Sequence, residues 1–224
     1  QKMNFYEAVK PKCLRDFVPD SESDLELLER IISNQVTFPN PAKRAILLHG
    51  AYGSGKTELA RLLPKLIEAS RDDDFDEGAF FEMFYSCSTT GGSQVAQAAM
   101  PTAVSFNKSG CHYIILDELD NLRMDAQKNM KSFITEHDHV IYIMTTNHLD
   151  SVDAGLRSRA HRISFERPSR ELWMARCKSI LNEFNAPIDE RFLKDLLRRS
   201  QCDARHILSE LENYILTHQA SRAA

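Results

Sequence analysis

The 224 residues are 42% hydrophobic and 27% charged, a composition that suits one substantial globular domain with a smaller one. Because 28 Lys and Arg stand against 32 Asp and Glu, the net charge of −4 excludes a uniformly basic nucleic-acid binder but allows a local basic track. The five cysteines contain no CxxC pair, which indicates neither a disulfide framework nor a zinc site and favours a reducing compartment, cytoplasmic or nuclear. No apolar run suits a membrane span and no signal-peptide pattern opens the chain, so neither secretion nor membrane insertion is expected.

The first part of the chain alternates strand and helix patterns. A short apolar run at 46–48 ends at a glycine-rich turn, and leucines at helical spacing follow over 58–68. The next expected elements, in chain order, are a strand over 80–85, a strand over 113–116, a helix over 126–136 and a strand over 140–144. Since such alternation produces a parallel sheet covered by helices, we expect an α/β domain over 3–167, preceded at 1–2 by a vector-derived remnant.

The last quarter of the chain carries only helical patterns. Apolar stripes at helical spacing run from Trp173 to Phe184, from Phe192 to Leu197 and from Ile207 to Ile215. Asp203 is placed to cap the amino end of the last one. These stripes predict a small three-helix domain over 168–224.

The stretch GAYGSGKT satisfies the phosphate-loop pattern G-x-x-x-x-G-K-[ST], and it lies after a predicted strand and before a predicted helix. In this context a glycine-rich turn that binds nothing is the weaker interpretation. Backbone N–H groups of such a loop surround phosphate oxygens, Lys56 adds positive charge at the β- and γ-phosphates, and Thr57 offers a hydroxyl to Mg²⁺. The residues expected to bind nucleotide here are Gly50, Gly53, Ser54, Gly55, Lys56, Thr57 and Glu58.

Two further motifs end strands of the predicted sheet. In YIILDELD, four apolar residues deliver Asp117, expected to hold Mg²⁺, and Glu118, expected to polarise an attacking water. In MTTN, Asn147 is placed to orient that water or to touch the γ-phosphate, although a turn-forming asparagine is an equal alternative for this motif alone. Ligands of open α/β sheets bind at this edge, so both motifs are expected beside the phosphate loop.

These motifs, in this order, resemble those of the AAA+ ATPases, and among them the clamp loader ATPase subunits such as the replication factor C small subunits. The resemblance covers essentially the whole chain and implies ATP and Mg²⁺ as ligands. YEAVKPKCLRDFV resembles the segment that wraps the adenine, with Lys10, Pro11 and Val18 in that role. QCDARHIL resembles the start of the second-sensor helix, which implies that Arg205 approaches the γ-phosphate of its own site.

The stretch LRSRAHRISF resembles the segment that holds the arginine finger of clamp loaders. The match implies that Arg159 projects into the ATP site of a neighbouring subunit, whereas Arg157 and Arg162 are interpreted as ordinary surface arginines. Ser86 is a candidate for the polar residue that acts on Glu118 in this family.

The implied partners are other AAA+ subunits, DNA, and a sliding clamp or helicase-like protein. Lys128 and Lys131, one turn apart on a predicted helix, suit a DNA-facing channel in a ring, though two lysines on a helix are more often a solvated face. Clamp loader subunits usually carry a third, helical collar domain, whereas this sequence stops just after the expected lid. A chain shortened before its collar leaves the clamp loader interpretation intact, and a protein that assembles without a collar favours a helicase loader or a transposition-type ATPase.

Three functions follow from these motifs. The first is an ATP-hydrolysing protein that loads or remodels a partner on DNA. The second is a nucleotide-gated assembly module in which hydrolysis is slow. The third, a small-molecule P-loop kinase, is disfavoured by Glu118 and by the helical lid that carries Arg205.

Overall fold

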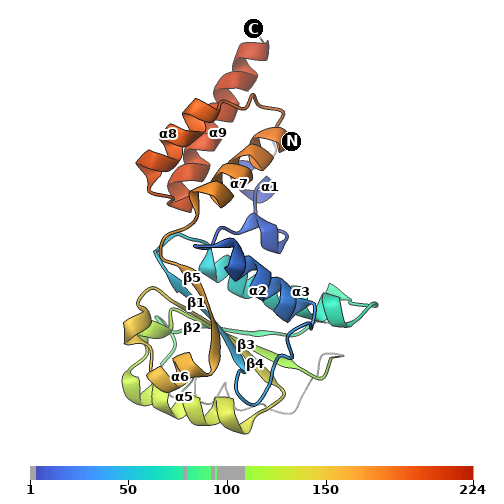
Figure 1. Ribbon diagram of the computed structural model, residues 1–224, viewed down its shortest axis with the longest axis vertical. Helices are drawn as coiled ribbons and strands as arrows, with labels where there is room; N and C mark the ends of the chain where they lie inside the picture. The colour runs from blue at the N-terminus through green and yellow to red at the C-terminus, as the bar shows by residue number, and fades with distance from the viewer. Residues whose placement is uncertain (1–3, 78–79, 92–93, 95–108, 224) are drawn as a thin grey trace.

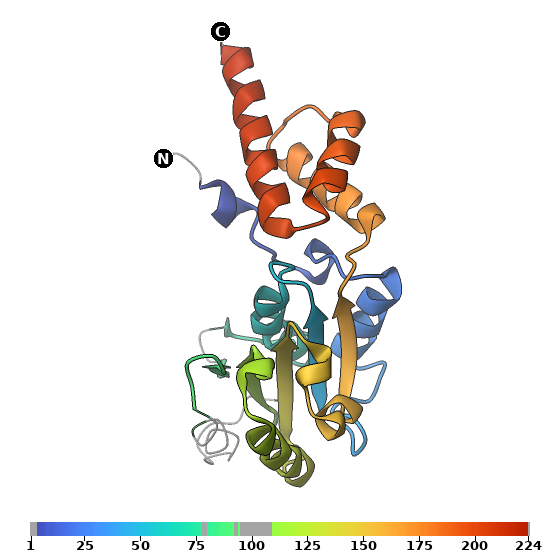
Figure 2. The same cartoon turned by 90° about the vertical axis from the view of Figure 1, so that its left-hand side faces the viewer.

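The computed structural model describes residues 4–77, 80–91, 94 and 109–223; the remnant expected at 1–2 lies outside these residues (Figure 1). Five parallel strands form one sheet in the order β2-β3-β4-β1-β5. The strands are β1 (Ala45–Gly50), β2 (Met83–Ser86), β3 (His112–Asp117), β4 (Val140–Thr146) and β5 (Ala160–Phe165). Their carboxyl ends point toward the helices that follow the sheet, α7 to α9 (Figure 2).

Helices cover both faces of the sheet. The helices are α1 (Phe5–Ala8), α2 (Glu22–Ile32), α3 (Lys56–Arg71), α5 (Met124–Glu136), α6 (Ala154–Ser158), α7 (Arg170–Glu183), α8 (Glu190–Ser200) and α9 (Ala204–Ala223), with short 3-10 turns at Leu14–Asp16, Leu119–Asn121 and Leu149–Ser151. Helices α2 and α3 pack on one face and α5 and α6 on the other (Figure 1). Strand β1 serves both layers, because Leu48 enters the first core and Leu47 the second. The α/β class with a parallel, helix-covered sheet is therefore confirmed.

A separate apolar cluster lies between α7, α8 and α9. Its buried members include Trp173 and Ile180 of α7, Leu196 of α8 and Leu211 of α9. The amino-terminal segment packs into this cluster through Phe5, Val9 and Val18, and into the first sheet core through Leu14 and Phe17. The start of the chain therefore lies against the last three helices, although some 150 residues separate them in sequence.

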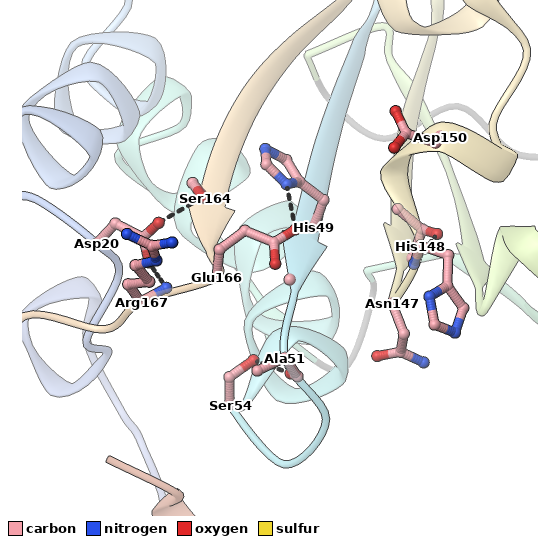
Figure 3. A network of polar contacts seen from close by, with 12 residues as sticks. Asp20, His49, Ala51, Ser54, Asn147, His148, Asp150, Ser164, Glu166 and Arg167 are labelled. Atoms are coloured by element: carbon pink, nitrogen blue, oxygen red, sulfur yellow. Dashed lines mark hydrogen bonds and ion pairs between the residues drawn. The ribbon is translucent and has the colours of Figure 1, made fainter. Parts of the chain in front are cut away.

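The linker between β5 and α7 is tied to the amino-terminal segment by Asp20. Its backbone N–H donates to Ser164 O at 2.9 Å, and its carboxylate accepts from Ser164 Oγ at 2.6 Å and from Arg167 N at 2.7 Å (Figure 3). One residue thus fixes both the end of β5 and the first residues beyond it. The three-helix unit therefore follows a linker that Asp20 holds at both Ser164 and Arg167.

The sequence patterns located most of these elements, but the short helices α1 and α6 were not predicted and three other elements also differ. The second strand begins at Met83 rather than at residue 80. Helix α2 was not predicted, although Leu25, Leu28 and Ile31 give it an apolar stripe. Strand β5 was not predicted either, because an edge strand with partly exposed His161 and Arg162 lacks a continuous apolar run.

Two further features concern the helices. Asp203 caps α9 as predicted, since its Oδ1 accepts from His206 N at 3.1 Å. Within the described part of the chain, no helix combines the length and apolar character needed to cross a membrane.

Candidate functional site

A pocket of about 370 Å³ lies where the carboxyl edge of the sheet meets the amino-terminal segment and helices α7 and α9. The predicted site residues that line it are Pro11, Val18, Gly53, Ser54, Gly55, Lys56, Thr57, Glu58, Glu118, Asn147 and Arg205. They come from five separate stretches of the chain. The fold therefore brings together most of the residues that the sequence motifs singled out.

Backbone geometry explains the glycines of the phosphate loop. Gly50 has φ +132°, and a Cβ there would lie 2.2 Å from the carbonyl carbon of Phe165, so only glycine fits against the end of β5. Ala51 N donates to Phe165 O at 3.0 Å and fastens the loop to that strand. Gly55, with φ +90°, turns the chain into α3. Gly50 supports the loop from behind and does not itself line the pocket.

The backbone of Lys56 begins α3, but its side chain folds back into the phosphate loop. Its Nζ donates to Gly50 O at 2.9 Å, to Ala51 O at 2.6 Å and to Ser54 Oγ at 3.2 Å. Burial lowers the pKa of Lys56 to about 8, against the opposing effect of nearby carboxylates, Asp117 first among them. The ammonium group is thus held by two carbonyl oxygens and a serine hydroxyl of the loop, which the oxygens of a bound phosphate can replace as its partners.

The oxygen atoms of Thr57 and Asp117 converge beside the loop. Thr57 Oγ1 donates to Asp117 Oδ1 at 2.8 Å, and Asp117 is only 8% exposed at the end of β3. Hydroxyl and carboxylate oxygens are the ligands that Mg²⁺ prefers. The two side chains that were predicted to hold the metal are therefore adjacent and chemically suited to it.

Glu118 lines the pocket just beyond the end of β3. Its backbone is left-handed, with φ 57° and ψ 52°, and Asn121 Nδ2 donates to its backbone O at 3.2 Å. Asn147 directly follows the neighbouring strand β4 and lies at the same edge of the sheet as the loop that carries Ser54 (Figure 3). Asp120 Oδ1 accepts from Asn147 N at 3.2 Å and from Thr146 Oγ1 at 2.9 Å, so the 3-10 turn after β3 positions the asparagine.

The last helix closes the pocket from the opposite side. A Cβ built on Gly53 would lie 3.6 Å from both Cδ and Nε of Arg205, and 3.5 Å from an oxygen of Asp203. Arg205 therefore lies directly over the phosphate loop. Its positive charge acts on Lys56, whose pKa it helps to lower.

The amino-terminal segment forms the remaining wall. Lys10 sits at the rim, with Nζ 3.9 Å from Glu58 Oε2 and its side chain more than half exposed. Sequence patterns missed the ion pair beneath it, in which Arg176 of α7 binds Asp16 with both side chains largely buried. Arg176 Nη2 also donates to Val9 O at 2.9 Å. This pair fastens the segment to the helices, because separating two buried charges is strongly unfavourable.

Arg159 lies away from the pocket. It immediately precedes β5, whose far end abuts the phosphate loop, and a strand of this length spans about 20 Å. Its Nε donates to Thr135 Oγ1 at 3.1 Å and its Nη1 to Gly155 O at 3.1 Å. The structure therefore separates Arg159 from the phosphate loop of its own chain.

The remaining candidates have ordinary local partners. Arg157 lies 3.6 Å from Asp150, and Arg162 is exposed on β5. Ser86 pairs with Asp117 in the sheet register, but its hydroxyl meets Ser88 Oγ at 2.8 Å. Lys128 is exposed, whereas the stem of Lys131 covers Gly155, where a Cβ would meet it at 2.3 Å.

A contact behind the phosphate loop connects β1 to the residue that follows β5. His49 Nδ1 lies 3.4 Å from Glu166 Oε1, and the two side chains point toward one another (Figure 3). Glu166 is also among the carboxylates that act on Lys56. Glu166 does not line the pocket, so its influence on the site is electrostatic.

Comparisons with known proteins agree with this arrangement. Residues 46–168 match the family model described as ATPase family associated with various cellular activities (AAA). The chain is 24% identical over 217 residues to replication factor C subunit 5 of Mus musculus, covering 95% of this chain and 60% of that protein. It is 22% identical over 211 residues to replication factor C small subunit 2 of Pyrobaculum arsenaticum, covering 93% of this chain and 62% of that protein.

A solved structure shows the same fold at low identity. The Thermotoga maritima RuvB Holliday junction branch migration motor superimposes with a TM-score of 0.67 and 16% identity, over 93% of this chain and 65% of that one.

The chain spans about 60% of the length of the replication factor C relatives named above. The family match extends from β1 to just beyond β5, across the loop and carboxylates described above. This chain belongs to the AAA family of ATPases and is related to the replication factor C subunits of clamp loaders.

Proposed function

We propose that this chain binds ATP with Mg²⁺ in the pocket, hydrolyses it, and works as one subunit of an assembly that loads or remodels a partner protein on DNA. The observation that carries the proposal is the convergence of Lys56, Glu118, Asn147 and Arg205 on one pocket beside the Thr57–Asp117 pair. The relation to replication factor C subunits supports the clamp loader version of this function.

Each residue has a distinct task in this proposal. The phosphate loop and Lys56 bind the β- and γ-phosphates, while Pro11 and Val18 contact the base. Thr57 and Asp117 hold Mg²⁺, which when bound neutralises charge on the phosphates. Glu118 takes a proton from the attacking water, whose position Asn147 sets, and Arg205 stabilises the γ-phosphate from the lid.

Arg159 completes a site on a neighbouring subunit. Its position just before β5 supports this role, because a residue some 20 Å from its own phosphate loop cannot act on the nucleotide bound there. The domain division follows from the same proposal, with residues 3–167 as the nucleotide-binding unit and 168–224 as the lid. DNA is the proposed ligand of exposed basic side chains such as Lys128 on α5.

The direct test is ATP turnover by the intact chain with and without primer–template DNA. We expect DNA to stimulate turnover, and the apparent DNA affinity obtained from that stimulation to fall steeply as salt rises, with a slope of about −0.9 in log–log units for each phosphate neutralised. Lys56→Ala is the control and should show no turnover in either condition. Slow turnover that DNA leaves unchanged would favour the nucleotide-gated module, and phosphate transfer to a nucleoside would favour the kinase.

The lowered pKa of Lys56 predicts a pH dependence of ATP binding. The group is charged below about pH 8 in the empty site, and phosphates favour the charged form, so binding above that pH must take up a proton. The ATP affinity should therefore hold steady from about pH 7 to 8 and fall by up to about tenfold per unit above it. Calorimetric titrations in buffers of different ionisation enthalpy would measure the proton uptake.

Lys56→Met is the matched variant for this pH experiment. It removes the titrating ammonium while keeping an unbranched side chain, so its weaker binding should lose the alkaline decline. A decline of the same size in Lys56→Met would assign the titration to another group.

A further inference from the structure

The hydroxyl of Thr145 connects the two carboxylate residues of the site. Thr145 lies on β4 and is 2% exposed. Its Oγ1 donates to Asp117 Oδ1 at 2.7 Å and accepts from Glu118 N at 2.9 Å. A threonine hydroxyl has one proton to donate, so its donor is fully used and faces Asp117.

These contacts occur where the strand ladder stops. Strands β3 and β4 pair residue by residue up to Leu116 and Met144, one position before Asp117 and Thr145. Beyond that point the backbone of Glu118 turns into the left-handed region, which is unfavourable for a residue with a side chain. Where the ladder of backbone hydrogen bonds ends, the Thr145 hydroxyl accepts a hydrogen bond from the N–H of Glu118, the residue that makes this turn.

The same hydroxyl belongs to a longer hydrogen-bonded path. Asp117 Oδ1 accepts from Thr57 Oγ1 at 2.8 Å as well as from Thr145 Oγ1. The path therefore runs from the first turn of α3, through the end of β3, to β4. Thr146 does not belong to it, since its hydroxyl contacts Asp120 instead.

We propose that Thr145 is a positioning residue for ATP hydrolysis, which sets the direction of the Asp117 carboxylate and the backbone turn that aims Glu118. The proposal rests on the proposed function of the pocket. Thr145 lines the pocket, but it acts through its two partners, because its one hydroxyl proton is donated to Asp117 and its oxygen accepts from Glu118 N. A small displacement of a catalytic group is enough to lower a rate strongly.

The test compares Thr145→Val, which keeps the shape and removes the hydroxyl, with Thr145→Ser, which keeps the hydroxyl. We expect Thr145→Val to lower kcat by about 100-fold while the KM for ATP changes by less than about threefold. Thr145→Ser should restore kcat to within a few-fold of the unaltered protein. The apparent affinity for Mg²⁺, measured as the difference in ATP binding with Mg²⁺ and with a chelator, should fall in Thr145→Val and recover in Thr145→Ser.

A loss of stability must be separated from a loss of positioning. Tyr113→Phe is the matched control, because Tyr113 is 1% exposed on β3 and its hydroxyl donates to Glu68 Oε1 at 2.7 Å, away from the pocket. This variant should lower the melting temperature and keep kcat. Parallel losses of stability and kcat in Tyr113→Phe and Thr145→Val would overturn the proposal, and so would a normal kcat in Thr145→Val.

The outcomes also separate this proposal from the function on which it rests. If the unaltered protein binds ATP but never hydrolyses it, the proposed hydrolysis fails. The Mg²⁺ dependence of ATP binding then decides the role of Thr145 alone. An equal Mg²⁺ effect in Thr145→Val and the unaltered protein would overturn that role.

Discussion

Glu118→Gln should stop ATP turnover and leave ATP binding intact. The side chain lines the pocket beyond β3, and as a carboxylate it can accept the proton of an attacking water, which an amide of the same shape cannot. We expect kcat to fall by about 10² to 10⁴-fold, the range over which general-base catalysis contributes. Single-turnover hydrolysis of labelled ATP, together with equilibrium binding of the same nucleotide, would separate the two effects.

The control for this substitution must remove a nearby negative charge without touching the pocket. Glu166→Gln does so, because Glu166 acts on Lys56 through its charge and pairs with His49 behind the loop. Its turnover should stay within a few-fold of the unaltered rate. Equal losses of turnover in both variants would show that the net charge near the site matters rather than a general base at Glu118. Unimpaired turnover in Glu118→Gln would show that Glu118 is not the base.

The sequence located the phosphate loop and the strand carboxylates because each motif carries its own structural context. An apolar run followed by a glycine turn and a leucine stripe specifies strand, loop and helix locally, and β1 and α3 follow that order. Strand β3 could also be predicted from the sequence, because it is buried on both faces and ends in Asp117. Parallel strands then place these motifs at one edge of the sheet.

The features that the sequence did not reveal depend on partners that are distant along the chain. Thr145 looks like an ordinary strand threonine until the register of β3 and β4 sets it beside Asp117, 28 residues earlier. Arg176 and Asp16 are 160 residues apart and meet only because the amino-terminal segment packs on α7. Neither spacing nor periodicity reports contacts of this kind.

The second large effect is a loss of ATP hydrolysis in Arg159→Ala. It depends on contact between chains, because Arg159 is proposed to act on the ATP site of a neighbour. Arg159→Ala should bind ATP normally and hydrolyse it about 10³-fold more slowly or worse, because an arginine supplied to the γ-phosphate stabilises charge that develops in the transition state. Lys56→Ala should also be inactive, since its own loop lacks the ammonium group. An equimolar mixture should regain part of the turnover, because each inactive chain supplies what the other lacks.

The rescue in the mixture is the informative result, since it separates a finger from a structural arginine. Arg159 holds Thr135 and Gly155 O in its own chain, so its removal could disturb α5 and α6 without any role in a neighbour. A local disturbance would persist in the mixture, whereas a missing finger would be replaced by the intact Arg159 of the Lys56→Ala chain. Arg162→Ala, from an exposed position on β5 three residues later, should hydrolyse ATP normally. Normal turnover by Arg159→Ala alone, or a mixture no more active than its parts, would confine Arg159 to that local role.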